Sequence, residues 1–405
     1  MITQNVHALL DALYTLGKLS EGGVYRPVYS EPWQMAHRQV AEWMAQCGLR
    51  VRADAVGNLI GRIDGSVDGP VVATGSHIDT VRGGGRLDGA LGVVGGLIAL
   101  STLRSQHGQP RLPLELIVTC EEEGSRFTNN FWGSLSIVGE ADEKQANQHH
   151  DVDGVTIAQA MRQIQLDPAR IAQAARSDIG WFLEMHIEQG AVLEQKQLDL
   201  GIVTAITGLT HFRVTVTGRA DHAGTTPMQI RNDALTGAAA MILAIEHAAR
   251  ALGAPAVATV GRISVEPGQA NVVPSSVLFS IDARHPDRSQ QLQLCADIRS
   301  ELYRIADERA LGIHIEQLTE HPPVPMAPEI IHAVQAAAEE LGVSHQQMPS
   351  GAGHDAQIMA RRCKAGMLFV PSIGGRSHTP AEDTAPAALE RGIQVLTGAL
   401  YRLAY

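Results

Sequence analysis

The stretch VVATGSHIDT, residues 71–80, is an apolar run that ends in polar residues. Short apolar runs bounded in this way are typical of buried strands. A second apolar run spans residues 114–119, and small residues with a helical pattern fill residues 90–103 between the two. Because strand, helix and strand alternate in this order, the sequence predicts an α/β fold with a mostly parallel sheet. In such sheets the functional side chains lie beyond the carboxyl ends of the strands.

The pattern changes between residues 211 and 320, where apolar and polar residues alternate, as in FRVTVT at residues 212–217. The order of the expected elements there is β-α-β-β-α-β, which indicates a small ferredoxin-like α+β domain. Patterns of the first kind then return. We therefore predict a discontinuous larger domain, residues 1–208 and 323–405, with a smaller domain inserted at residues 209–322.

The composition excludes several classes of partner. The chain has 405 residues, 44% of them apolar and 19% charged, which is enough for two globular domains. Acidic residues outnumber basic ones 43 to 32, and no Lys/Arg stripe is available to neutralise a phosphate backbone, so we expect no nucleic-acid partner. The sequence lacks both an export signal at its start and an uninterrupted apolar stretch of about 18 residues, so we expect a cytoplasmic protein that does not bind membranes.

His77 and Asp88 are the first candidates for a metal site. His77 follows the strand expected at residues 71–74, and Asp88 stands in the motif LDG further along the chain. The imidazole offers a neutral nitrogen, and the two carboxylate oxygens of Asp88 can bridge two cations. Asp79 is spaced to accept a hydrogen bond from the other nitrogen of His77. By itself, a His-x-Asp pair is more often part of a surface turn.

Three consecutive acids, Glu121, Glu122 and Glu123, follow the strand expected at residues 114–119. Burying adjacent like charges is costly unless cations neutralise them. A solvated acidic loop would explain the charges but not the apolar strand that leads to them. We therefore assign Glu123 as a metal ligand and Glu122 as the base that takes a proton from the attacking water.

Two further histidines complete a candidate ligand set. His186 follows an apolar strand expected at residues 181–184, and His378 lies in a Gly-rich turn. Each histidine alone is more often structural, and the four cysteines are too far apart to form a thiolate site. Together, the oxygen and nitrogen ligands suit two divalent ions, Mn²⁺ or Zn²⁺. The set consists of His77, Asp88, Glu123, His186 and His378.

Seven short motifs in a fixed order carry a resemblance to a known family: GSHIDT, LDG, EEEGSRF, HIEQG, HAGTTPM, GAGHDA and SHTPAE. From about residue 23 to the C-terminus, the chain resembles the hydantoinase/carbamoylase branch of the M20-type metallopeptidase-like family. That branch includes allantoate amidohydrolases, L-N-carbamoylases and β-ureidopropionases. The resemblance implies the same five ligands with Asp88 bridging two ions, Glu122 as the base, and a lid that commonly mediates formation of a homodimer.

The resemblance also assigns residues of the lid. It implies that His222 stabilises the oxyanion of the tetrahedral intermediate, often from the lid of a partner subunit, so the chemistry requires the two domains to meet. Asn271 and Arg284 match positions that hold the substrate carboxylate, which suits the planar fork of arginine. From the residues alone, a capping or core role for His222 and a surface ion pair for Arg284 stay open.

Four further residues are candidates for the substrate pocket. Gly353 and His354 lie in a Gly-rich turn that leads into a helix, where free N–H groups favour anions. A plain turn with a helix cap is the alternative for these two residues. Gln189 in the motif HIEQG and His211 beside the expected start of the lid complete the set.

Several stretches bear on the substrate, a small ureido or carbamoyl acid. FWGS around Trp132, GAGHDAQI and the final LYRLAY look more like allantoate amidohydrolases, which release ammonia, CO2 and ureidoglycine. Residues 208–212, GLTHF, differ from the Gly-Gln-Arg-Arg-Tyr type of those enzymes, and Tyr25 stands where relatives usually carry Thr. The sequence favours allantoate and leaves N-carbamoyl-L-amino acid or β-ureidopropionate hydrolysis open. A dipeptidase or aminoacylase is more remote, and an inert metal-binding protein would be expected to have lost the base or a ligand.

Overall fold

Two compact units make up the computed structural model, which describes residues 5–127 and 129–405. The first unit comprises Met1–Thr204, Met326–Met348 and Ala352–Tyr405, and the second comprises Ala205–Pro325 with Pro349–Gly351. Each unit has its own hydrophobic core. The chain crosses between the units close to the expected positions at 208 and 323, and the return of residues 349–351 to the second unit is not foreseen by the sequence pattern.

A nine-stranded sheet forms the centre of the first unit, with the order β1-β2-β4-β3-β5-β16-β6-β14 and with β15 beside β6. Strands β4, β3, β5 and β16 are parallel neighbours, whereas β1, β2, β6 and β14 pair antiparallel. The predicted, mainly parallel sheet is therefore confirmed at its centre. The strands are β1 (Arg50–Ala53), β2 (Leu59–Ile63), β3 (Val71–His77), β4 (Leu114–Thr119), β5 (Ile179–Ile187), β6 (Leu200–Ile206), β14 (Val324–Pro325), β15 (His345–Ser350) and β16 (Lys364–Val370).

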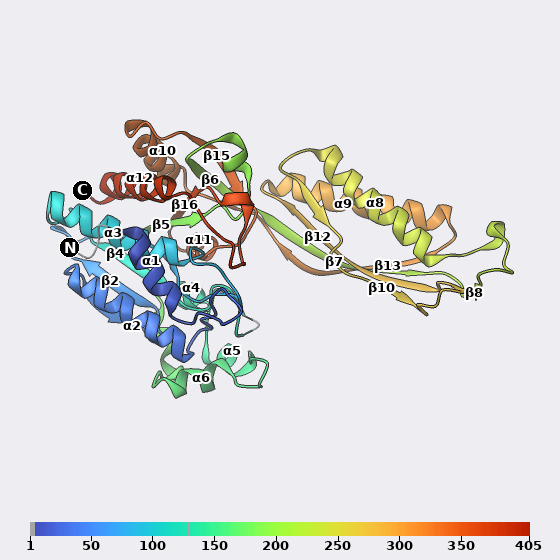
Figure 1. The fold of residues 1–405 in the computed structure, drawn as a ribbon, viewed down its shortest axis with the longest axis horizontal. Coiled ribbons are helices and arrows are strands. Elements are labelled where there is room, and N and C mark those ends of the chain that lie inside the picture. Colours follow the sequence, from blue (N-terminus) through green and yellow to red (C-terminus); the bar gives the residue numbers. More distant parts are fainter. Residues whose placement is uncertain (1–4, 128) are drawn as a thin grey trace. The chain divides into compact units, whose positions relative to one another are not determined.

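Helices α3 (Ala90–His107) and α12 (Pro386–Ala404) pack against each other and against this sheet (Figure 1). Helix α3 approaches the strands closely because its surface residues are small: a Cβ added to Gly92 would lie 2.5 Å from the carbonyl oxygen of Met185. Gly108, at φ 74°, ends the helix. The other described helices of the unit are α1 (Val6–Thr15), α2 (Glu31–Gln46), α4 (Trp132–Ile137), α5 (Glu143–Gln148), α6 (Ile157–Gln163), α7 (Val192–Lys196), α10 (Pro328–Glu340) and α11 (Asp355–Met359), with 3₁₀ turns at Pro168–Ala174 and Ile373–Gly375.

A five-stranded antiparallel sheet forms the second unit, with the order β10-β12-β7-β13 and with β9 beside β12. Burial alternates along β7, where Phe212 and Val214 belong to the core and Arg213 between them is exposed. Apart from the short β8–β11 ladder, the elements follow the order β-α-β-β-β-α-β, so three strands lie between the two helices where the sequence predicts two. In chain order they are β7 (Gly208–Thr217), β8 (Asp221–His222), a 3₁₀ turn (Met228–Ile230), α8 (Ala234–Leu252), β9 (Val257–Thr259), β10 (Ile263–Glu266), β11 (Val272–Val273), β12 (Ser276–His285), α9 (Arg288–Glu308) and β13 (Gly312–His321).

Helix α8 is long and apolar enough to cross a membrane by length and composition, and 28% of the tested stretch is buried. Its residues Ala238, Met241 and Ile245 belong to the core of the second unit, which α8 shares with α9 and the sheet. A helix that packs on a core passes the same test, so α8 is weak evidence for a membrane span.

Candidate metal centre and substrate residues

The predicted metal ligands come from the ends of neighbouring parallel strands in the first unit. β3 ends at His77, and Glu123 follows the end of β4. His186 lies inside β5, because that strand continues past the predicted residues 181–184 in register with β16. His378 lies in the turn region after β16. Since β4, β3, β5 and β16 run parallel side by side, these side chains meet at one edge of the sheet.

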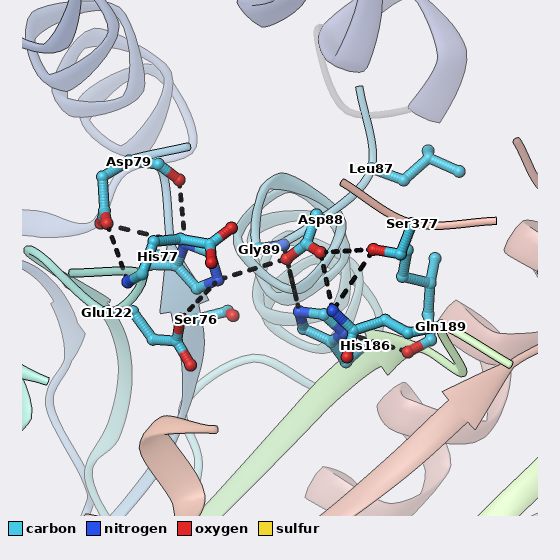
Figure 2. A network of polar contacts seen from close by, with 12 residues as sticks. Ser76, His77, Asp79, Leu87, Asp88, Gly89, Glu122, His186, Gln189 and Ser377 are labelled. Atoms are coloured by element: carbon cyan, nitrogen blue, oxygen red, sulfur yellow. Dashed lines mark hydrogen bonds and ion pairs between the residues drawn. The ribbon is translucent and has the colours of Figure 1, made fainter. Parts of the chain in front are cut away.

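Asp88 belongs to two groups of these side chains. Figure 2 shows its carboxylate linked to His77 and to His186. Its Oδ1 lies 3.1 Å from Nε2 of His186 and 3.5 Å from Nε2 of His77, whereas its Oδ2 lies 3.3 Å from Nε2 of His378. The same nitrogen of His378 is 3.4 Å from Oε2 of Glu123. Two sets of three possible ligands therefore share Asp88, and within each set the ligand atoms lie within 4.8 Å of one another.

The contacts of His77 aim one ring nitrogen into the site. Nδ1 lies 3.0 Å from the carbonyl oxygen of Asp79, so the expected contact with Asp79 is made by its backbone and not by its carboxylate. That carboxylate is 3.9 Å from Nδ1 and accepts from the amide of Glu123. Nε2 of His77 is buried and has no hydrogen-bond partner among the described residues. Gly89 makes room for the ring, since its φ is 66° and an added Cβ would lie 2.4 Å from Cε1 of His77.

Further hydrogen bonds hold Asp88 in place. Gln189 Nε2 and Ser377 Oγ each donate to its Oδ2 at 2.8 Å. Glu382 Oε1 accepts the backbone N–H groups of Leu87 and Asp88, at 2.8 and 3.0 Å. Gln189 is expected at the substrate, whereas Ser377 and Glu382 are not among the expected site residues, although both stand in the motif SHTPAE. The motif was therefore a usable signal for these two residues.

Acidic groups gather at this edge of the sheet with little access to solvent. Asp79 and Glu121 are fully buried, and Glu122 is 6% exposed. Burial, reinforced by neighbouring carboxylates, raises the pKa of Glu122 well above its usual value and that of Glu123 to about 7. Clustered carboxylates in a buried place are stabilised by cations. Together with the unpartnered imidazole nitrogen, they fit divalent metal ions that take oxygen and nitrogen ligands.

His354 lies beside these ligands, at the start of α11. Its imidazole is buried and packs edge to face against that of His186, with ring centroids 4.5 Å apart. Burial, reinforced by the charge of His186, lowers the pKa of His354 well below its usual value, so this ring is neutral. Gly353 packs next to Phe131, whose Cζ would lie 3.1 Å from an added Cβ. His354 therefore lies next to the candidate ligand His186, and Gly353 precedes it in the chain.

His222 and Asn271 form one group of predicted residues in the second unit, at the β8–β11 ladder. The amide of Ala223 donates to the carbonyl oxygen of Asn271 at 2.9 Å, and both predicted residues are exposed. Nδ1 of His222 accepts from the backbone N–H groups of Gly224 and Thr225, at 3.0 and 3.2 Å. Because Nδ1 accepts, the proton of a neutral His222 is on Nε2, which is therefore a hydrogen-bond donor.

His211 and Arg284 form the other group, with Asp282 between them. Asp282 Oδ2 lies 3.1 Å from Nε2 of His211 and accepts from Nη2 of Arg284 at 2.8 Å. A depression of about 980 Å³ is lined by this cluster and by neighbouring residues of the same unit. Asn271 precedes the first residue of β12, whereas Arg284 is the last but one residue of that strand. At about 3.3 Å per residue, the length of β12 separates the two groups by roughly 26 Å.

Comparison with known proteins shows the family. The model of Peptidase family M20/M25/M40 matches residues 73–402. The chain is 40% identical to an allantoate amidohydrolase of Bacillus subtilis (strain 168), over 100% of this chain and 98% of the relative. It is 39% identical to an N-carbamoyl-L-amino-acid amidohydrolase of Paenarthrobacter aurescens, over 92% of each chain. The crystal structure of an amidase of the hydantoinase/carbamoylase family from Burkholderia multivorans matches with a TM-score of 0.93 at 34% identity, over 98% of this chain and 97% of that one. These matches confirm the resemblance carried by the motifs, and the chain belongs to peptidase family M20/M25/M40, in its hydantoinase/carbamoylase branch.

Proposed function

We propose that the chain is a two-metal amidohydrolase that cleaves the C–N bond of a small ureido or N-carbamoyl acid, with allantoate as its substrate. The observation that carries the proposal is the position of Asp88, whose two oxygens face two different sets of ligands. His77 and His186 would hold one ion, and Glu123 and His378 the other, with Asp88 shared. Bound Mn²⁺ or Zn²⁺ would supply Lewis acidity toward the substrate carbonyl and lower the pKa of the attacking water.

Glu122 is the proposed general base. Its Oε2 lies 3.7 Å from Nε2 of His77, so the carboxylate reaches the same edge of the sheet without belonging to either ligand set. From this place Glu122 would take a proton from the attacking water and return it to the leaving nitrogen.

Two groups of the second unit are proposed to bind the rest of the reacting molecule. Arg284 would bind the substrate carboxylate, because its planar guanidinium matches a carboxylate in a bidentate pair. His222, which presents a donor at Nε2, would stabilise the oxyanion of the tetrahedral intermediate.

The length of β12 supports a second copy of the chain at the site. His222 and Asn271 lie beyond one end of this strand and Arg284 lies near the other, roughly 26 Å away, which exceeds the extent of a small acid. One copy of the second unit therefore cannot contact a single substrate molecule with both groups. We infer that His222 and Asn271 come from one copy of a homodimer and Arg284 from the other.

Hydrolysis of N-carbamoyl-L-amino acids is the second candidate. It is supported by the relative at 39% identity and by the stretch GLTHF, which departs from the allantoate type at residues 208–212. For both candidates, we propose that the enzyme works in the cytoplasm.

A turnover screen with the Mn²⁺- or Zn²⁺-loaded enzyme tests the proposal. The substrates are allantoate, N-carbamoyl-L-amino acids, N-carbamoyl-β-alanine and dipeptides. We expect the highest kcat/KM on allantoate, with release of ammonia. The highest value on an N-carbamoyl-L-amino acid would select the second candidate, and turnover of dipeptides alone would contradict both.

A further inference from the structure

Asp282 lies at the centre of a polar cluster on the open face of the sheet in the second unit. Its neighbours in β12, Ile281 and Ala283, belong to the core, so Asp282 faces away from the helices. In the antiparallel register it stands directly between His211 on β7 and Thr259 on β9. The side chain of Asp282 is 30% exposed and lines the depression described above.

The carboxylate of Asp282 holds Arg284 by one side of its guanidinium. Oδ1 accepts from Nε at 2.9 Å and Oδ2 from Nη2 at 2.8 Å, while Nη1 donates to the carbonyl oxygen of Gly351 at 2.7 Å. A guanidinium has five N–H groups, and these contacts use three of them. One N–H is left on each terminal nitrogen, which is the number that a bidentate carboxylate requires.

The same carboxylate decides which nitrogen His211 offers to a ligand. Oδ2 of Asp282 lies 3.1 Å from Nε2 of His211, and an ionised carboxylate can only accept, so the proton of the ring is on Nε2. In the neutral ring, Nδ1 is then an acceptor. The side chain of His211 is 41% exposed, so this acceptor is accessible to an N–H group of a bound molecule.

The ionisation state of Asp282 bears on how it affects substrate binding. Burial alone would raise its pKa, but the hydrogen bonds and charges of Arg284 and His211 lower that pKa below the usual value. Asp282 is therefore ionised and offsets the charge of Arg284. The carboxylate of Asp282 weakens the attraction of Arg284 for the carboxylate of a substrate. Any benefit of Asp282 to substrate binding must therefore come from the orientation that it gives to Arg284.

We propose that Asp282 is a positioning residue for substrate binding, which orients the free N–H pair of Arg284 toward a carboxylate and the Nδ1 of His211 toward an N–H donor on the neighbouring group. The inference rests on the proposed function, since Arg284 is taken as the carboxylate-binding residue. It names the preferred class of substrate: a carbamoyl or ureido acid whose distal group carries an N–H. Both a second ureido group and a carboxamide meet this condition.

Asp282→Asn tests the orientation of Arg284. The amide keeps the shape of the side chain but has one acceptor oxygen and places N–H groups against two other donors. We expect KM for N-carbamoyl-L-asparagine to rise about 10- to 100-fold, as for loss of a hydrogen bond to a charged group, with kcat nearly unchanged. Asp282→Glu, which keeps the carboxylate, should recover part of this loss. Glu316→Gln is the matched control, because Glu316 pairs with Arg213 of the same sheet at 3.1 Å and does not contact the cluster.

His211 variants give a readout that does not depend on the folding of an Asp282 variant. N-carbamoyl-L-asparagine and N-carbamoyl-L-leucine have side chains of similar shape, but only the first has a distal N–H. We expect the ratio of their kcat/KM values to fall about tenfold in His211→Phe, and His211→Asn, which keeps an acceptor close to the position of Nδ1, to retain part of the ratio.

The outcomes separate this inference from the proposed function. A wild-type enzyme that hydrolyses neither allantoate nor the two carbamoyl amino acids would overturn the proposed function and this inference with it. A wild-type enzyme that hydrolyses allantoate but not N-carbamoyl-L-asparagine would overturn the substrate class named here and leave the proposed function standing. If the wild type is active and Asp282→Asn leaves KM unchanged, the positioning role alone would be overturned. The same holds if Asp282→Asn lowers kcat at a constant KM. An unchanged substrate ratio in both His211 variants would overturn the acceptor assigned to His211.

Discussion

The two units hold their functional side chains in opposite ways. In the first unit His186 is 1% exposed and Glu122 is 6% exposed, and both are surrounded by other polar groups. In the second unit the side chains of His211 and Arg284 are 41% and 32% exposed, and Arg284 keeps two N–H groups free of the contacts described above. Burial fixes charged groups because they must be paired when water is removed. In the proposed function, the first unit would therefore hold its groups in place before substrate binds, whereas the second would keep donors available for substrate.

Glu122→Gln should cause the largest effect, because it removes the proton acceptor at the buried edge while keeping the shape of the side chain. Proton transfer by such a group contributes about 10²–10⁴-fold to the rate, so we expect kcat to fall by about this factor or more. Metal content and melting temperature should stay close to those of the wild type, which separates loss of chemistry from loss of structure. A variant with near wild-type kcat would show that another residue is the base.

His222→Ala should reduce kcat by about 10²–10³-fold, the usual effect of removing one oxyanion donor. We propose that Arg284 acts in the same chain as the base and that His222, which β12 separates from Arg284, comes from the other copy, so we expect complementation across a dimer. His222→Ala and Glu122→Gln proteins, each nearly inactive alone, should regain part of the activity after subunit exchange. If subunit exchange is demonstrated independently and no activity returns, His222 and the base act in the same chain. Full activity of the His222→Ala protein alone would exclude His222 from the mechanism.

Gly89→Ala compares a buried contact with backbone strain. Gly89 and Gly83 both have positive φ, 66° and 72°, so an alanine at either position strains the backbone and lowers stability. Only at Gly89 does the added Cβ meet another group, the ring of His77, whereas at Gly83 nothing lies within 4 Å. Gly89→Ala should therefore also weaken metal binding. Equal metal affinity of the two variants in a chelator competition would contradict this role of Gly89.

Arg284→Lys should have the smallest effect on kcat among these changes, because Arg284 is proposed to bind the substrate carboxylate and takes no part in the proton transfer. Lysine keeps the charge but loses the planar fork, so we expect KM to rise about tenfold or more. Substrates whose carboxylate is amidated should be poor for the wild type and should discriminate little between wild type and variant. An unchanged KM for the free acid would exclude Arg284 from the carboxylate site.

The sequence predicts the site residues of the first unit better than those of the second unit, for a physical reason. Residues such as Glu123 stand directly after an apolar strand, so their position follows from local pattern and from the rule that parallel strand ends meet. Ser377 contacts Asp88, 289 positions away in the chain, and Glu382 contacts Leu87, 295 positions away. The motif SHTPAE marks both residues, but no local pattern reveals which residues they contact. Asp282 is equally hidden, because its role depends on the register between β7 and β12. From the residues alone, a capping or core role for His222 and a surface ion pair for Arg284 stay open, and only the motifs indicate a function.

Anomalous diffraction from crystals of the metal-replete protein is the sharpest test of the two-metal site. We expect two ions about 3.5–4 Å apart, one on each side of Asp88. One ion should contact His77 and His186, and the other Glu123 and His378, with both contacting the Asp88 carboxylate. A single ion per chain in fully active protein, or two ions of which only one contacts Asp88, would contradict it.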